Sequence, residues 1–421
     1  MEIARSLRAN PASGMGDAPL NSICAASELV DHLTLHQAAL TDLRRELHAC
    51  PELGYKEVQT ASTIAQRLRA IGVDEIHQGI AGTGIVAVLR GEKGDGPTVG
   101  LRAELDALAM EEANEVPWRS KRSGKMHACG HDGHMAALVG AMGYLARHRQ
   151  FPGKICAIFQ PAEEGGAGAK AMIAEGLLER FALSSVYSIH NAPWIPFGEV
   201  VANAGPMMAA ADRLEILIEG GGGHGGIPHK GTDAILAAAA VIQSVQSIVS
   251  RSIDPLDAAV VSFGGVSAGS MEQYNVLPRC VRMIGTVRTF RPEVQDLIED
   301  LLHRTAANTA SAFGARAVVK FMRRYPATIN APEKAAIALS AAERLFGAEK
   351  ARKEMPPSTA GEDFSFMLQA LPGAYIWLGQ GTGEQSESLH SPRYDFDDRL
   401  IVPAAALFVR IAQEELAPRQ A

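Results

Sequence analysis

Short apolar segments that alternate with segments of helical periodicity constrain the fold of this chain most strongly. Apolar runs over 84–89, 98–101, 154–159 and 185–189 have the length of buried strands. Between them, residues 134–148 carry apolar side chains at helical spacing. Strands that alternate with helices predict an α/β domain, built on a mostly parallel sheet flanked by helices. Upstream of these strands, two helices are expected within 28–71, separated by a turn at Pro51–Gly54.

The order of the elements changes near residue 210. Predicted strands at 214–220, 260–265, 281–290 and 317–322 alternate with predicted helices at 233–251 and 292–313. This βαββαβ order is that of a ferredoxin-like sandwich, which can fold as its own unit. The strand–helix pattern then resumes. We therefore predict a discontinuous main domain (29–208 and 324–421), an inserted ferredoxin-like domain (209–323) and a disordered leader (1–28).

Composition limits the classes of function. A net charge of −7 argues against nucleic acid or an anionic membrane surface as the main partner. The five cysteines are odd in number and widely spread, which is typical of a reducing compartment. No apolar segment of a secretory signal follows the first basic residues, and the apolar run around Gln243 is too short to span a bilayer. We expect a cytoplasmic protein that binds neither nucleic acid nor membrane.

The segment MHACGHDGH is a candidate metal site. Cys129 and His131 stand two residues apart, which places both side chains on one side of an extended segment. Thiolate and neutral imidazole are good ligands for first-row divalent metals. His127, Asp132 and His134 lie close by. The alternatives are a Cys–His nucleophile pair, whose members seldom reach attack geometry on one short segment, and ordinary core histidines.

A second segment, IFQPAEEGG, follows about thirty residues later. It is an apolar strand that ends in Glu163 and Glu164, and the ends of strands are where α/β active sites lie. Adjacent carboxylates repel each other unless a cation is near. A metal could take one glutamate as ligand and leave the other as a base for water. The alternative is a solvated acidic turn.

Isolated residues extend the candidate set. His190 ends an apolar strand, and His390 lies in a loop before the last predicted helix. In the inserted domain, His224 is surrounded by glycines, Asn275 lies in YNVLP, and Arg288 lies on a strand. A guanidinium suits a carboxylate because it can pair bidentately. Taken alone, His190 and His390 favour a hydrogen-bonded structural histidine, and Arg288 favours an ordinary surface arginine.

Nine ordered segments together resemble the M20 metallopeptidase superfamily, specifically its amidohydrolase branch of hippurate hydrolases, N-acyl-amino-acid deacylases and auxin-conjugate hydrolases. The resemblance runs from about Leu40 to the C-terminus. The segments are LRAELDAL, MHACGHDGH, IFQPAEEGGAGA, IHNAP, GGHGGIPH, YNVLP, GTVRTF, GEDFSFM and LHSPRYDF.

The resemblance implies a pair of divalent metal ions, Mn²⁺ or Zn²⁺ foremost, with Ni²⁺ or Co²⁺ as options. The ligand positions of the family match Cys129, His131, Glu164, His190 and His390. Glu163 matches the general base, and Asp106 matches an acidic residue that supports the site from behind the ligands. The implied reaction is hydrolysis of the amide bond of a small N-acyl-amino acid by metal-activated water.

The resemblance also gives the inserted domain a role as a lid and dimerisation domain, so that a homodimer or homotetramer is expected. His224 matches a lid histidine that reaches the partner's active site and stabilises the oxyanion. Asn275 and Arg288 match lid positions that hold the substrate carboxylate in related branches.

Two departures from the family pattern stand out, Glu104 in place of Asp and Ser188 in place of Gly. Three other functions compete with the amidohydrolase. A dipeptidase or carboxypeptidase of the same superfamily usually has an HxD motif and a bridging Asp, where this chain has Glu104 and Cys129. A catalytically inactive binding protein would not need every ligand and Glu163. A structural zinc protein predicts one closed site of four ligands, whereas this chain offers five.

Overall fold

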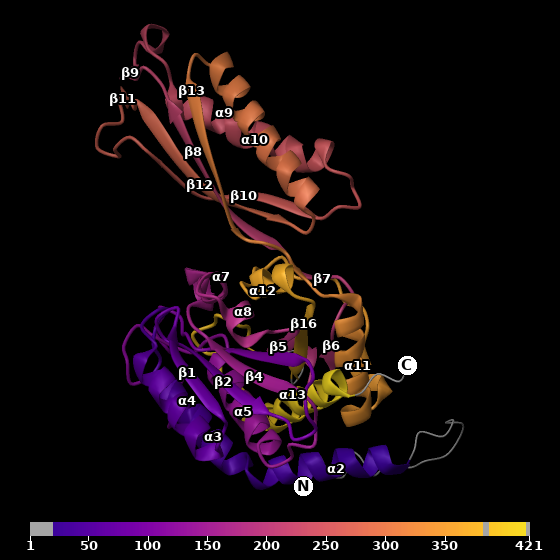
Figure 1. Ribbon diagram of the computed structural model, residues 1–421. Helices are drawn as coiled ribbons and strands as arrows, with labels where there is room; N and C mark the ends of the chain where they lie inside the picture. The colour runs from indigo at the N-terminus through magenta and orange to yellow at the C-terminus, as the bar shows by residue number, and fades with distance from the viewer. Residues whose placement is uncertain (1–19, 382–386, 418–421) are drawn as a thin grey trace. The chain divides into compact units, whose positions relative to one another are not determined.

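The computed structural model describes residues 20–381 and 387–417, which fall into two compact units (Figure 1). Of the described residues, the larger unit comprises 20–205, 329–356, 366–381 and 387–417, and the smaller comprises 206–328 and 357–365. The short segment 357–365 joins the smaller unit through backbone hydrogen bonds from Ala209 to the carbonyls of Ser358 and Ala360. The sequence pattern did not predict that assignment.

The larger unit is built on an eight-stranded sheet of order β1-β2-β4-β3-β5-β16-β6-β15. Its strands are β1 (Glu75–Ile80), β2 (Gly84–Arg90), β3 (Thr98–Glu104), β4 (Lys154–Gln160), β5 (Ser185–Pro196), β6 (Val200–Val201), β15 (Ala351–Arg352) and β16 (Gly373–Gly381). The four central strands β4, β3, β5 and β16 run parallel, and β1 and β2 form an antiparallel edge. The predicted α/β class with a mostly parallel sheet is confirmed.

Helices cover this sheet, which is why its central strands are buried along almost their whole length. They are α2 (Leu20–Leu35), α3 (Gln37–Ala49), α4 (Val58–Ile71), α5 (His131–Leu145), α6 (Glu163–Gly166), α7 (Gly168–Ala174), α8 (Leu177–Phe181), α11 (Pro332–Phe346), α12 (Ser365–Ala370) and α13 (Ile401–Leu416). Helices α5 and α13 pack on each other and on β3 (Figure 1).

The N-terminal helices differ from the prediction. Residues 28–71 contribute to three helices and not two, because α2 ends at Leu35 and α3 begins again at Gln37. Of the predicted leader, residues 20–28 belong to α2, while residues 1–19 lie outside the described residues. Leu29 and Leu33 join the core cluster of the larger unit, and this packing stabilises the helix.

The smaller unit has a four-stranded antiparallel sheet of order β10-β12-β8-β13. Its elements are β8 (Ala210–Glu219), α9 (Ala234–Ser247), β10 (Ala259–Ala268), β12 (Cys280–Thr289), α10 (Pro292–Ala312) and β13 (Arg316–Tyr325). This is the βαββαβ connectivity expected from the sequence. There are also two sheets of two strands each. One pairs β9 (Gly223–His224) with β11 (Val276–Leu277), and the other pairs β7 (Pro206–Met208) with β14 (Thr328–Ile329).

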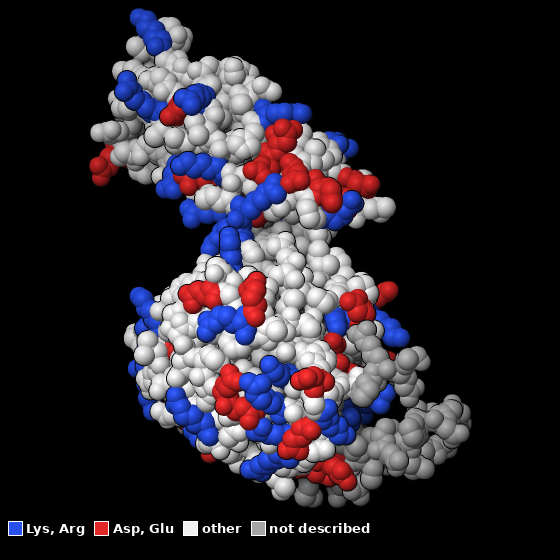
Figure 2. All heavy atoms as spheres, viewed as in Figure 1, with Lys and Arg blue, Asp and Glu red and all other residues white. Residues whose placement is uncertain are grey.

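One helical segment, Ala234–Ser252, is long and apolar enough by length and composition to cross a membrane. Its buried residues include Ala237, Val241 and Val245, which belong to the core cluster that α9 and α10 form with the sheet. Gln243 and Gln246 are exposed on its other face. This amphipathic pattern is that of a core helix of the smaller unit. On the face drawn in Figure 2, basic and acidic side chains are interspersed over both units.

Candidate metal centre

The candidate site lies at the carboxyl ends of β3, β4 and β5, which are neighbours in the parallel part of the sheet. β3 ends at Glu104, which pairs in register with Gln160 at the end of β4. The chain then turns at Ala162, which has a positive φ of 52°, and Glu163 and Glu164 follow at the start of α6. Ligands of open α/β sheets bind at this edge because the loops that leave the strands converge there.

The beginning of α5 brings Cys129 and His131 together. The segment is not extended as predicted, because Gly130 adopts a left-handed turn (φ 92°) and His131 is already the first helical residue. A Cβ at Gly130 would approach within 2.5 Å of the side-chain oxygen of Asn191, so glycine is required there. Ligand atoms of Cys129, His131 and Glu164 lie within 4.8 Å of one another. The predicted convergence is therefore present, by a different local geometry.

The two isolated histidines join this group from distant parts of the chain. Nε2 of His190 lies 3.4 Å from Sγ of Cys129. Nε2 of His390 lies 3.1 Å from a carboxylate oxygen of Glu164. His390 has a positive φ of 63°, and its backbone N–H donates to the carbonyl of Ala128 at 2.8 Å, which ties its loop to the cysteine segment. The five predicted ligands thus lie at one place.

Asp106 and Glu163 border the ligand group. The backbone N–H of Glu164 donates to Oδ2 of Asp106 at 2.9 Å, and Nδ1 of His131 lies 2.8 Å from the Asp106 carbonyl oxygen. Asp106 therefore holds a histidine and a glutamate in position from behind, as such supporting contacts do in metal sites. Glu163 is buried, and its negative charge acts on the Cys129 thiol.

A second group was not predicted as a unit. Ligand-type atoms of Glu104, His131, His134 and His190 also lie within 4.8 Å of one another. Both ring nitrogens of His134 are engaged, with Glu104 at 2.9 Å and Asn191 at 2.7 Å. His134 therefore supports the His190 ring, whose centroid is 4.5 Å away. The spacing of His131 and His134, one helical turn, was the signal in the sequence.

The two departures from the family pattern meet at one buried arginine. Arg102 forms an ion pair with Glu104 and donates to Oγ of Ser188 at 3.3 Å. All three side chains are fully buried. Glu104 also accepts from His134, so its carboxylate links Arg102 to the histidine group. Glu104 and Ser188 are thus partners in one buried polar network.

The charges at the site favour a cation. Burial, then the carboxylates of Glu164 and Glu163, raise the pKa of the Cys129 thiol well above its usual value. Burial alone would lower the pKa of His131, but its hydrogen bond to Asp106 and the charges of Glu104 and Asp106 raise it to about 10. Nε2 of His131 is buried and has no hydrogen-bond partner among the described residues. Thiol, imidazole and carboxylate ligands around this excess of negative charge fit divalent metal ions.

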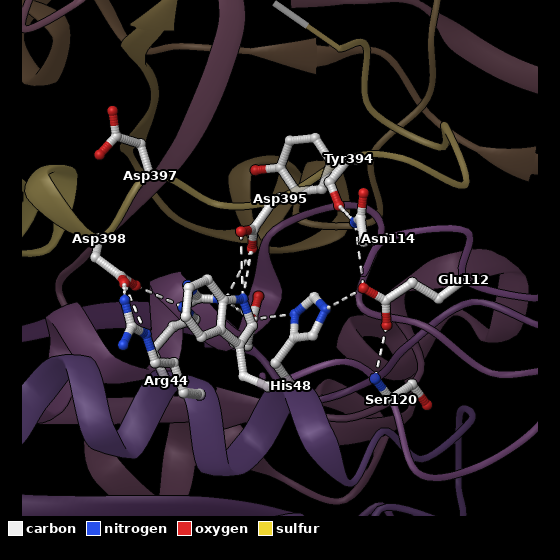
Figure 3. Close-up of polar contacts among 12 residues, drawn as sticks. Arg44, His48, Glu112, Asn114, Ser120, Tyr394, Asp395, Asp397 and Asp398 are labelled. Carbon is white, nitrogen blue, oxygen red and sulfur yellow. Dashed lines mark hydrogen bonds and ion pairs between the residues drawn. The ribbon is translucent and has the colours of Figure 1, made fainter. Parts of the chain in front are cut away.

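A partly buried ion-pair network around Arg44 and His48 reaches the beginning of α5, and Figure 3 shows these two residues with Asp395 and Asp398. Arg44 on α3 lies 3.6 Å from Asp132, 3.0 Å from Asp395 and 2.7 Å from Asp398. His48, one turn further along α3, contacts Asp132 at 2.8 Å. Burial would lower the pKa of His48, but the charge and hydrogen bond of Asp132 raise it to about 9. Asp132 follows His131 directly, so the network fixes the turn that presents the candidate ligands.

Replacing Arg44 with Leu is expected to destabilise the protein by about 3–5 kcal/mol, because the partner carboxylates would lose a buried counter-charge. Urea unfolding measures this change. The control is Arg67→Leu, which removes a pair between Arg67 and Glu46 at 2.9 Å whose side chains are both about half exposed. That change should stay within about 1 kcal/mol. Equal losses in the two variants would contradict the anchoring role.

The candidate residues of the smaller unit lie at two ends of its sheet. His224 on β9 pairs with Val276 on β11, and the carbonyl of the adjacent Asn275 accepts from Gly225 at 2.7 Å. Both side chains are exposed. Arg288 lies near the far end of β12, eight residues beyond Cys280, or roughly 26 Å at about 3.3 Å per strand residue. The structure therefore brings His224 and Asn275 together and separates Arg288 from them.

An α/β fold with thiol, imidazole and carboxylate groups gathered at the carboxyl ends of parallel strands defines a candidate metalloenzyme. Residues 100–414 match the model of the peptidase family M20/M25/M40. The chain belongs to this family.

Similar proteins cover nearly the whole chain. The N-acetylcysteine deacetylase of Bacillus subtilis is 38% identical over 375 residues, which cover 89% of this chain and 96% of the relative. The hippurate hydrolase of Campylobacter jejuni is 37% identical over 380 residues, which cover 90% and 97%. A crystal structure from Bacillus subtilis, described as a dinuclear metal-binding peptidase of the M20 family, is 33% identical with a TM-score of 0.80 and covers 91% and 99%.

Proposed function

We propose that this protein is a metal-dependent amidohydrolase that cleaves small N-acyl-amino acids into a carboxylic acid and an amino acid. The observation that carries the proposal is the convergence of Cys129, His131, Glu164, His190 and His390 with Glu163 beside them. The relatives named for deacetylation of N-acetylcysteine and hydrolysis of hippurate, which is itself an N-acyl-amino acid, support the same class of substrate.

The five converging residues would hold a pair of divalent metal ions, Mn²⁺ or Zn²⁺ first, with Ni²⁺ and Co²⁺ as alternatives. When bound, the ions would polarise the amide carbonyl and make a water molecule more acidic. Asp106 keeps His131 and Glu164 in place through the contacts described above.

Glu163 takes the proton from the attacking water at its carboxylate and then delivers it to the nitrogen of the leaving amine. His224 donates a hydrogen bond to the oxygen of the carbonyl as negative charge develops there. Asn275 and Arg288 bind the carboxylate of the amino-acid portion, Arg288 in the bidentate manner that a guanidinium allows. No covalent bond to the protein is needed.

The test is a hydrolysis screen over N-acetyl, N-benzoyl and indoleacetyl amino acids, with each metal added to stripped protein. Dipeptides and peptides with a free C-terminus belong in the same screen, because they are the substrates of the competing dipeptidase or carboxypeptidase function. Turnover of the acylated amino acids at higher kcat/KM than the peptides supports the proposal. Faster turnover of the peptides, or no turnover with any of the four metals, contradicts it.

We further propose that the protein acts in the cytoplasm as a homodimer or homotetramer assembled through the smaller unit. Within one chain, Arg288 lies roughly 26 Å along β12 from Cys280, which is at the end of that strand nearer to the hairpin of His224 and Asn275. That distance exceeds the size of a small substrate, so one chain cannot place both groups on the same carboxylate. Lid residues supplied by two subunits would resolve this separation.

Mixing two inactive variants tests this arrangement. When His224→Ala and Glu163→Gln protomers are mixed in equal amounts, each heterodimer contains one complete site if His224 acts across the interface. About a quarter of wild-type activity is then expected, from statistical exchange between C₂ dimers. Heterodimers demonstrated by native mass spectrometry that remain inactive would show that His224 acts within its own chain.

A further inference from the structure

The antiparallel edge of the larger sheet contains a cavity of about 160 Å³, which is remote from the candidate metal centre. Residues on one face of β1, β2 and β4 line it, at alternate positions as strand geometry requires. They are Glu75 and His77 on β1, Val88 and Arg90 on β2, and Lys154 and Cys156 on β4. The end of α8, with Arg180 and Phe181, closes the cavity from outside the sheet.

Three of the lining side chains are cations, and one is a carboxylate. Glu75 forms ion pairs with Arg90 and with His77, the latter at 2.9 Å. These contacts lower the pKa of the Glu75 carboxyl, so that it is ionised and engaged. Among the residues that the structure describes, neither Lys154 nor Arg180 has a carboxylate within ion-pair distance. The cavity therefore holds an excess of positive charge at neutral pH.

The strand register makes this excess unfavourable by itself. Arg90 on β2 lies directly opposite Lys154 on β4. Like charges directly opposite each other on neighbouring strands are destabilising. The other nearby carboxylate, Asp74, is bound by Arg149 at 2.8 and 2.9 Å and also interacts with Arg90, but among the described residues it forms no ion pair with Lys154 or Arg180. An anion between Lys154, Arg90 and Arg180 would remove the repulsion.

The floor and wall of the cavity are preorganised. Cys156 at its base is fully buried, and Phe181 is held against His77 by an edge-to-face contact with ring centroids 5.0 Å apart. Arg180 lies over the Phe181 ring, 5.5 Å from its centroid. Such packing restricts the rotamers of Arg180 and lowers the entropy that this side chain loses when it binds a ligand.

We propose that this cavity is a binding site for a small doubly charged oxyanion, either free phosphate or the phosphate group of a small phosphomonoester. Lys154, Arg180 and Arg90 hold it by charge-assisted hydrogen bonds. The site is separate from the metal centre, because Lys154 and Gln160 stand at opposite ends of β4, roughly 20 Å apart at about 3.3 Å per residue.

Calorimetric titration of the metal-loaded protein tests this site, with inorganic phosphate as the probe and ionic strength held constant with chloride. Arg180→Gln and Lys154→Gln should each weaken phosphate binding roughly tenfold, and the double variant should remove it. Lys93→Gln, which neutralises an exposed cation outside the cavity, is the matched control and should bind as the wild type does. Arg180 is exposed on a short helix, so its replacement is tolerated even if Lys154→Gln impairs folding.

Two results would overturn the proposal. One is phosphate binding of equal affinity in the wild type and in Arg180→Gln, which would place the anion at the metal centre. The other is the absence of saturable binding below roughly 10 mM. Glycerol 3-phosphate in a parallel titration distinguishes the source of the anion. If glycerol 3-phosphate binds more tightly than inorganic phosphate, the cavity is assigned to phosphomonoesters. If it binds more weakly, the cavity is assigned to free phosphate.

Discussion

Replacing Glu163 with Gln is expected to lower kcat/KM by about 10²–10⁴-fold while the metal content stays unchanged. Gln has the shape of Glu but cannot take a proton from water or return it to the leaving amine. Glu163 is well placed for this task because it follows the end of β4 after a turn of two residues and is buried close to Cys129. The proposed role of Glu163 as base is separate from ligation, which we assign to its neighbour Glu164. Initial rates and elemental analysis of the same preparation measure both quantities.

The matched control is Glu179→Gln, an exposed glutamate on another short helix of the same unit. It should retain full activity. A Glu163→Gln enzyme with more than about a tenth of wild-type kcat/KM would exclude Glu163 as the general base. If metal is lost together with activity, Glu163 serves as a ligand and the roles of the two glutamates are exchanged.

Replacing Cys129 with Ser is expected to weaken metal binding by at least about 10–100-fold, and activity at limiting metal should fall with it. The serine hydroxyl is a far weaker acid than a thiol and a poorer ligand for these ions. The groups around it, which are the imidazoles of His131 and His190 and the carboxylates of Glu163 and Glu164, would remain. Competition with a chromogenic chelator measures the affinity, and excess metal should restore part of the activity.

Cys156→Ala is the control for this experiment. Cys156 is also fully buried, but it lies in the amino-terminal half of β4, at the opposite end of that strand from the candidate metal centre. Its metal affinity should equal that of the wild type. Unchanged metal affinity in Cys129→Ser would argue against the thiolate as a ligand. Restoration of the Cys129→Ser enzyme to wild-type kcat by excess metal would show that the thiolate binds metal without taking part in the chemistry.

The sequence predicted the central strands and the second βαββαβ unit because both depend on local apolar patterns. β4 is a nearly continuous apolar run and β3 begins with one over 98–101, which is the pattern of strands buried on both faces. The strand β1, Glu75–Ile80, was missed, since this edge strand is only partly buried and has a polar sequence. The helix break at His36 was missed as well, because α2 and α3 share one continuous helical periodicity.

Composition and motif order, then, were enough to predict the fold class, the membership of the M20 family and the set of candidate metal ligands. Only the tertiary structure decided how those residues meet. Gly130 bends the cysteine segment out of an extended conformation, and Glu104 on β3 meets His134 on α5 in a supporting group for which the only signal in the sequence was the helical spacing of His131 and His134. The physical reason is the same in each case. A side chain's chemistry and the periodicity of its neighbours are local, whereas distances between strands such as β3 and β5 exist only after the sheet has formed.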